Sequence, residues 1–282
     1  MLLFHSPHEL VIAMTPDANP TQLVALARIT NKYQFRSLEQ WALGALNTYY
    51  TRVGAFDDVP TTHPPTLPLG PLPAHGSSAT PAQPSLIQIT ELAALCERFD
   101  LLDATITRWK RLIGEGKDLA LAISVGERFN LRSMLGLAYH AMMLKGKASW
   151  DADPYLSRDQ RVRLLCGYYS LGKFWEALPG SPPPISHSSR CTGQQRCAKC
   201  FGNVWRMILE SSTQIIPTLQ REDVLGKIMV AEGMMKALVK DEIPSQGYLD
   251  GMPYCKDSAL AVVSMGFREI KECLADRFTD DF

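Results

Sequence analysis

Three segments of this chain share one pattern of apolar and polar positions, in which a base, an aromatic, a polar and an apolar residue follow in order. The segments are Lys32-Tyr33-Gln34-Phe35, Arg98-Phe99-Asp100-Leu101 and Arg128-Phe129-Asn130-Leu131. Apolar positions align on both sides of them without gaps, first at Leu23, Ile89 and Leu119 and later at Leu46, Leu112 and Met142. Each unit therefore predicts a helix, a tight turn and a second helix, capped by the side chain of Ser37, Asp103 or Ser133.

Recurring helix pairs indicate an all-α protein, an array of stacked helical hairpins. We expect the first pair over residues 21–56 and the second and third pairs over 85–146. Ser37 with Gln40 three residues later has the spacing of a capping box. In the second pair, Leu92, Leu95 and Cys96 are expected to face inward.

Residues 57–84 interrupt the pattern with eight prolines among Gly, Ser, Thr and His. Proline removes a backbone donor and disfavours helix in the residue before it, so we expect a long disordered insert here. Phe99 lies 66 residues after Tyr33, whereas Phe129 lies only 30 residues after Phe99. Removing the insert restores a regular repeat of helix pairs.

Residues 147–282 predict a further helical region. Ser157 and Gln160 form another capping box, and Val162, Leu165, Cys166 and Tyr169 recur after it at helical spacing. Two long helical patterns follow, over residues 223–240 and 257–277. The spacing between apolar residues in the last pattern alternates between three and four positions. This spacing predicts a helix that packs against another helix of the same chain, with a homodimer seam as the alternative.

Charge and cysteine usage narrow the class of protein. Lys plus Arg and Asp plus Glu both number 29, and a zero net charge argues against nonspecific binding to nucleic acid. The chain has no apolar run of 18 residues and no secretory leader, so we expect no membrane partner. Its seven cysteines are an odd number, which favours a reducing compartment, the cytoplasm or the nucleus.

One cluster of residues has the composition of a metal site. His187, Cys191, Cys197 and Cys200 lie within a loop and helix start at 186–200. Nitrogen and sulfur ligands of this kind hold tetrahedral structural zinc, and Cys255 is an alternative fourth ligand. A metal-free loop with reduced cysteines stays open, because only one C-x-x-C pair is present. A redox role is disfavoured, since no strand–turn–helix pattern surrounds that pair.

Motifs of catalysis are missing from the sequence. It has no Gly-x-Ser-x-Gly, no His-Glu-x-x-His and no phosphate-binding glycine loop, and residues 114–117 only superficially resemble one. His140 lies beside Met142 and Met143 on an apolar helix, where a histidine is expected to be packed rather than reactive. We therefore expect a protein that is not an enzyme and has no catalytic or cofactor-binding residues.

The stretches 29–43, 94–104 and 187–200 resemble the BACK-like helical region that follows a BTB/POZ fold, as found in the BTB-domain-containing proteins of mushroom-type (basidiomycete) fungi. The resemblance implies an intracellular protein–protein interaction module, an adaptor or scaffold. Its candidate partners are a cullin-type ubiquitin ligase or a second copy of the chain. Residues 1–20 would then be the remnant of a BTB fold. The alternative function is a zinc-stabilised regulatory protein, nuclear in location, that uses the cluster at 187–200.

Overall fold

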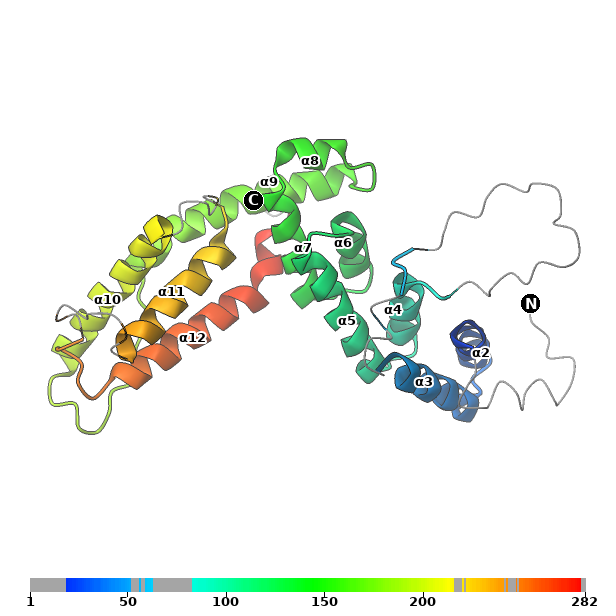
Figure 1. The fold of residues 1–282 in the computed structure, drawn as a ribbon, viewed down its shortest axis with the longest axis horizontal. Coiled ribbons are helices and arrows are strands. Elements are labelled where there is room, and N and C mark those ends of the chain that lie inside the picture. Colours follow the sequence, from blue (N-terminus) through cyan, green and yellow to red (C-terminus); the bar gives the residue numbers. More distant parts are fainter. Residues whose placement is uncertain are drawn as a thin grey trace, which may run out of the picture. The chain divides into compact units, whose positions relative to one another are not determined.

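A computed structural model describes residues 19–51, 56, 59–62, 83–215, 220, 222–240, 242, 247 and 249–279 (Figure 1). All regular secondary structure among these residues is helical, which confirms the all-α prediction. The expected BTB remnant lies outside the described residues except for its last two positions. Most of the expected Pro-rich insert, residues 57–58 and 63–82, lies outside them as well.

The described helices pack into two compact units. The first unit comprises the residues up to Asp118 together with Val125–Leu131, and the second comprises Leu119–Ser124 and everything from Arg132 onward. The helices are α2 (Pro20–Lys32), α3 (Arg36–Thr51), α4 (Leu86–Leu95), α5 (Phe99–Gly114), α6 (Leu119–Arg128), α7 (Arg132–Leu144), α8 (Lys147–Ala152), α9 (Arg158–Ala177), η1 (Leu178–Gly180), α10 (Gln194–Ile215), α11 (Val224–Val239), α12 (Lys256–Glu272) and η2 (Leu274–Arg277). None of the described helices is both long enough and apolar enough to cross a bilayer.

The same three-residue turn ends α2, α4 and α6. Its middle residue is left-handed in each case, with φ of 61° at Gln34, 51° at Glu97 and 52° at Asn130. The next amide then donates to the carbonyl five residues earlier, at 2.8 Å in all three turns: Phe35 to Thr30, Arg98 to Ala93 and Leu131 to Gly126. This is the Schellman way of closing a helix, and its recurrence confirms the predicted repeat of helix–turn–helix units.

The sequence alignment of the three helix–turn–helix units placed the turn of the second unit three residues too late. Tyr33 and Phe129 both lie one position before the left-handed residue, and the preceding base lies over each ring, at 5.6 Å for Lys32 and 5.1 Å for Arg128. In the second turn Cys96 takes that position, whereas Phe99 is the first residue of α5 and is 72% exposed. The turn depends on its backbone conformation and on the apolar faces beside it, so an aromatic residue is not required.

The predicted helix caps are partly wrong. Ser37, Asp103 and Ser133 lie inside α3, α5 and α7, because each of these helices begins directly after its turn. At α5 the N-cap position is taken by Arg98, whose side chain makes no capping hydrogen bond. The capping box of Ser157 and Gln160 at α9 is confirmed. An unpredicted box, formed by Ser85 and Gln88, begins α4.

Unit 1 is stabilised by an apolar core and by a glutamate that binds arginines of two other helices. Leu43, Leu46, Ile89 and Leu92 are fully buried or nearly so, whereas Leu95, predicted to face inward, is 59% exposed. The carboxylate of Glu91 on α4 accepts from Arg28 of α2 at 3.0 Å and from Arg128 of α6 at 2.7 Å. Trp109 is fully buried and donates its indole N–H to Thr90 at 3.1 Å. The contacts of Glu91 connect the first helices of the three helix pairs.

In unit 2 the end of the described chain packs back onto earlier helices. Leu274 and Ala275 of η2 contact α7 where Gly136 leaves space, and the ring of Phe278 fills the space beside Gly167 of α9. That ring also stacks on Tyr139, with 5.1 Å between centroids. The last long helix packs inside the chain, as predicted, since its Phe267 is buried and stacks on Trp205 of α10.

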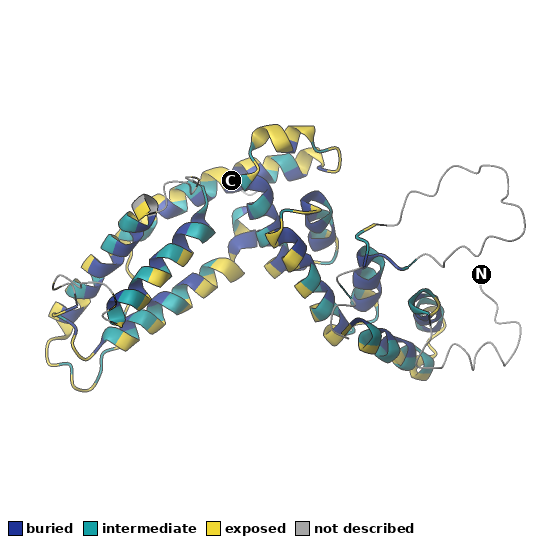
Figure 2. Ribbon diagram, viewed as in Figure 1, coloured by how far each residue is buried: buried dark blue, intermediate teal, exposed yellow. Residues whose placement is uncertain are grey.

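Helix α9 buries a different face from the one that its apolar pattern predicts. Val162, Leu165 and Tyr169 are exposed, and of the predicted set only Cys166 is buried. Figure 2 shows exposed as well as buried positions along α9. The buried face instead carries Gln160, Leu164, Gly167, Leu171 and Trp175. Helix α9 therefore has two apolar rows, of which the structure covers one.

His140 is packed inside unit 2, as the sequence predicts. It is 4% exposed, and its Nε2 lies 3.7 Å from a carboxylate oxygen of Asp223, the N-cap of α11. Burial lowers the pKa of His140, and the opposing effect of Asp223 is smaller. The neutral imidazole is thus the form that fits the folded protein.

We expect acidification to destabilise unit 2 through His140. Its folded pKa is below the unfolded value of about 6.5, so stability is intact above that value and falls as the unfolded chain takes up the proton. The loss is at most about 1.4 kcal/mol per pH unit, continuing down to the folded pKa. Urea unfolding between pH 7 and pH 5 should show a smaller drop for His140→Gln than for the wild type. An equal drop in both proteins would contradict this assignment.

Candidate metal centre

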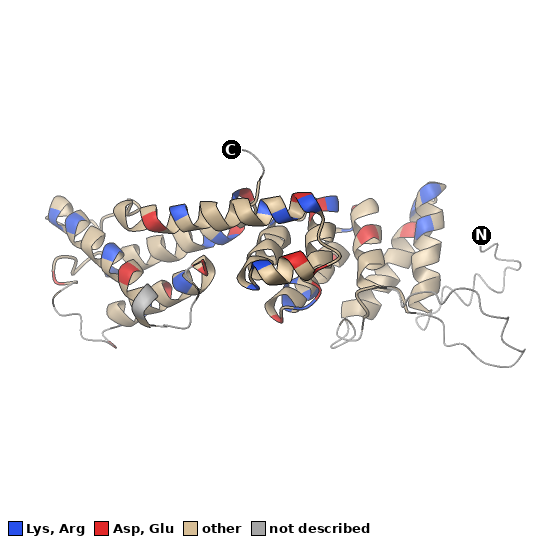
Figure 3. Ribbon diagram, turned by 90° about the horizontal axis from the view of Figure 1, so that it is seen from above, with Lys and Arg blue, Asp and Glu red and all other residues tan. Residues whose placement is uncertain are grey.

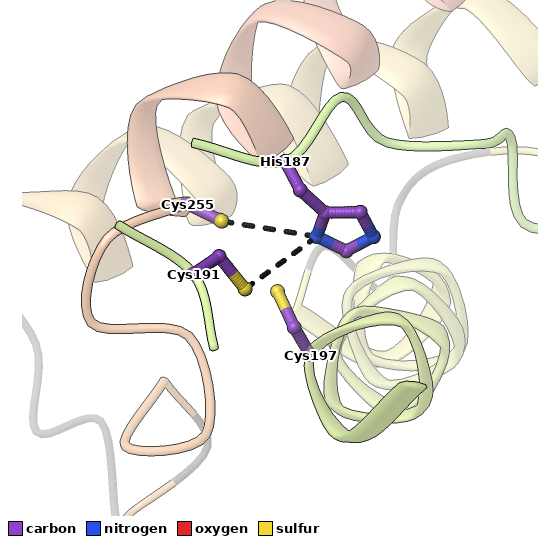
Figure 4. Close-up of side chains that lie close together, drawn as sticks. All are labelled: His187, Cys191, Cys197 and Cys255. Atoms are coloured by element: carbon purple, nitrogen blue, oxygen red, sulfur yellow. Dashed lines mark hydrogen bonds between the residues drawn. The ribbon is translucent and has the colours of Figure 1, made fainter. Parts of the chain in front are cut away.

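Four side chains from three separate segments of unit 2 converge at one point (Figure 4). His187 and Cys191 belong to the loop after η1, Cys197 lies in the first turn of α10, and Cys255 is the N-cap residue of α12. Pro182, Pro183 and Pro184 favour an extended chain in the first part of the loop. A turn in which the Cys191 amide donates to Ser188 at 2.9 Å then brings Cys191 back toward His187.

The distances suit a tetrahedral ion. The Nδ1 atom of His187 lies 3.8 Å from the sulfur of Cys191 and 3.9 Å from that of Cys255, and all four ligand atoms lie within 4.8 Å of one another. A tetrahedron with zinc–sulfur bonds of about 2.3 Å and a zinc–nitrogen bond of about 2.0 Å has edges of roughly 3.5–3.8 Å. Small side-chain rotations would bring the four atoms to that spacing, so the residues fit zinc.

Without a metal the buried thiols keep their protons, so a bound cation has to displace them. Cys197 and Cys255 are each 1% exposed, and burial, followed by the nearby Cys255 and Cys191, raises the pKa of Cys197 to about 12. The thiol is therefore protonated without a metal, and a bound divalent cation would replace the proton. The amide of Ser188 donates to the sulfur of Cys255 at 3.5 Å, and such outer contacts orient ligands.

An open pocket of about 200 Å³ adjoins the cluster. Cys191 and Cys255 form part of its wall, together with Arg196, Asp250 and Tyr254. A cation could reach the ligands from solvent through this pocket. The positive charge of Arg196 would also offset the single net negative charge that three thiolates leave on a zinc ion.

Three of the four predicted ligands are brought together, and the fourth is replaced. Cys200 is absent from the cluster, and its side chain instead lies so close to Gly251 that an added Cβ there would be 3.0 Å from its sulfur. Cys255, the alternative fourth ligand, takes its place. Cys197 and Cys200 lie one turn apart on α10, and only Cys197 joins the cluster.

Neither family models nor curated proteins nor solved structures show a significant match to this chain. The resemblance to fungal BTB-domain-containing proteins therefore stays a prediction.

Proposed function

We propose that this chain is a non-enzymatic protein-binding module whose second unit is fastened by a structural zinc ion. The observation that carries the proposal is the convergence of His187, Cys191, Cys197 and Cys255 to within 4.8 Å. These residues come from a loop and from the first turns of two helices that lie far apart in sequence. A bound ion would cross-link all three segments, as a disulfide or a large core does elsewhere.

The ligand set points to a structural zinc ion rather than a catalytic one. Catalytic zinc keeps one position open for water, with three protein ligands, whereas structural zinc has four. Here one nitrogen and three sulfur ligands would complete the shell, and two of the cysteines are almost fully buried. Such a centre holds no water that could be activated for hydrolysis.

The zinc proposal is tested by the metal content of the purified protein. We expect one zinc ion per chain for the wild type and for Cys200→Ser, and strongly reduced zinc for Cys255→Ser and Cys197→Ser. Cys200→Ser is the matched control, since it removes a nearby thiol outside the cluster. Wild-type protein that holds no zinc after purification with added zinc would refute the metal centre.

Protein binding is supported by apolar side chains at the turns of unit 1. Phe99 is 72% exposed, Leu95 and Tyr33 59% each, and Phe35 58%. The two helices that follow the first two turns are in contact, since Asn47 of α3 donates to Asp100 of α5 at 3.0 Å. Exposed aromatic and other large apolar side chains are typical of protein interaction sites.

The family resemblance names a cullin-type ligase as one partner to look for. Figure 3 shows Lys and Arg residues interspersed with Asp and Glu along the helices, so apolar contacts rather than one dominant charge should select the partner. We expect affinity purification followed by mass spectrometry to recover the partner with wild-type bait and with Met265→Ser. The double variant Phe35→Ser/Phe99→Ser should lose it. Equal recovery by all three baits would exclude this surface.

A further inference from the structure

The uncovered row of α9 has the spacing of a helix–helix seam. Arg158, Val162, Leu165, Tyr169, Gly172 and Glu176 follow one another at steps of four, three, four, three and four. Val162 is 42% exposed, Leu165 51% and Tyr169 59%, whereas the opposite face of the helix is buried in unit 2. Alternating steps of three and four keep one stripe facing a neighbouring helix over its whole length.

The order of residues in this row is complementary to itself when reversed. In an antiparallel pair centred on Gly167, Arg158 of one chain faces Glu176 of the other, Val162 faces Gly172, and Leu165 faces Tyr169. The outer pairs combine opposite charges and the inner pairs are apolar. A Cβ added at Gly172 meets nothing within 4 Å, so this position leaves open space for the branched Val162 of a second chain.

A parallel pair has no such complementarity. It would place Arg158 against Arg158 and Glu176 against Glu176, and like charges in contact are unfavourable. It would also place Gly172 against Gly172, which leaves a gap in the seam. The residues of this row therefore favour an antiparallel partner helix over a parallel one, and they also select the side chains that the partner helix must present.

We propose that α9 forms an antiparallel contact with α9 of a second copy of this chain. Among the contacts of Glu176, the exposed ion pair with Lys173, at 3.8 Å, is a weak surface interaction. One pair of helices buries less area than a permanent dimer needs, so the dimer forms in the micromolar range and exchanges with the monomer. None of the four metal ligands lies on α9, which makes this contact independent of zinc.

Reciprocal charge reversal tests the contact. Sedimentation equilibrium should show a concentration-dependent dimer for the wild type, and Arg158→Glu or Glu176→Arg alone should each weaken it by about tenfold or more. An equimolar mixture of these two variants should dimerise again, because both outer pairs become attractive in the heterodimer. Leu165→Asp should be monomeric, whereas Met265→Asp, an exposed methionine on α12, should dimerise like the wild type.

Two outcomes would overturn the proposal. One is a wild type that stays monomeric at millimolar concentration, and the other is a pair of charge variants that dimerise as well as the wild type or fail to recover when mixed. Circular dichroism on each variant shows that it has kept its helices, so a loss of dimer cannot be mistaken for unfolding.

Discussion

A chelator that removes zinc from the purified protein is expected to lower its melting temperature by roughly 10 °C. An ion that binds only the folded chain adds about 4 kcal/mol to the free energy of unfolding when its free concentration is a thousand times the dissociation constant. Without it, three buried or half-buried thiols and an imidazole are left to hold the loop near Cys191 and the first turns of α10 and α12. Those segments should loosen first.

The comparison that isolates this effect uses thermal melts with and without chelator for three proteins. Wild type and Cys200→Ser should both lose stability on chelation. Cys255→Ser should begin at the lower melting temperature and be insensitive to the chelator. If all three proteins melt alike, with or without chelator, the four side chains are neighbours without a shared ion.

Local signals in the sequence predicted the architecture well. The turns at Gln34 and Asn130 and the helix start at Ser157 depend on residues within six positions of one another, so a short pattern contains the information. The second turn was placed three residues too late, because Arg98-Phe99 imitates the base–aromatic pair of the other turns. The left-handed residue there, Glu97, has a side chain that gives no special signal for that conformation.

Features that depend on how distant segments meet were harder to predict. His187, Cys191 and Cys197 lie within eleven residues, whereas Cys255 lies 58 residues beyond Cys197, at the start of another helix. The exposed row of α9 illustrates the same limit, since Val162, Leu165 and Tyr169 fit helical spacing as well as the buried row does. Periodicity shows that a face is apolar, but only the tertiary structure shows which face is covered.

Two glycines of α9 should respond in opposite ways to alanine. A Cβ at Gly167 would lie 2.1 Å from the ring of Phe278, which is itself held against Tyr139. We expect Gly167→Ala to lower the free energy of unfolding by about 1–3 kcal/mol, because the ring must leave its place. Gly172→Ala meets no neighbour and should raise the same quantity by up to about 1 kcal/mol, since alanine is the better helix former.

Both substitutions add one methyl group to the same helix, so helix propensity alone would make them equal. Their difference in urea unfolding, measured at concentrations where the chain is monomeric, thus reports the contact with Phe278. A double variant separates the cause further: in a Phe278→Ala background the space beside Gly167 is empty, and Gly167→Ala should become neutral or stabilising. If Gly167→Ala destabilises by the same amount in both backgrounds, the aromatic ring does not occupy that space, and the packing of the last described residues against α9 is wrong.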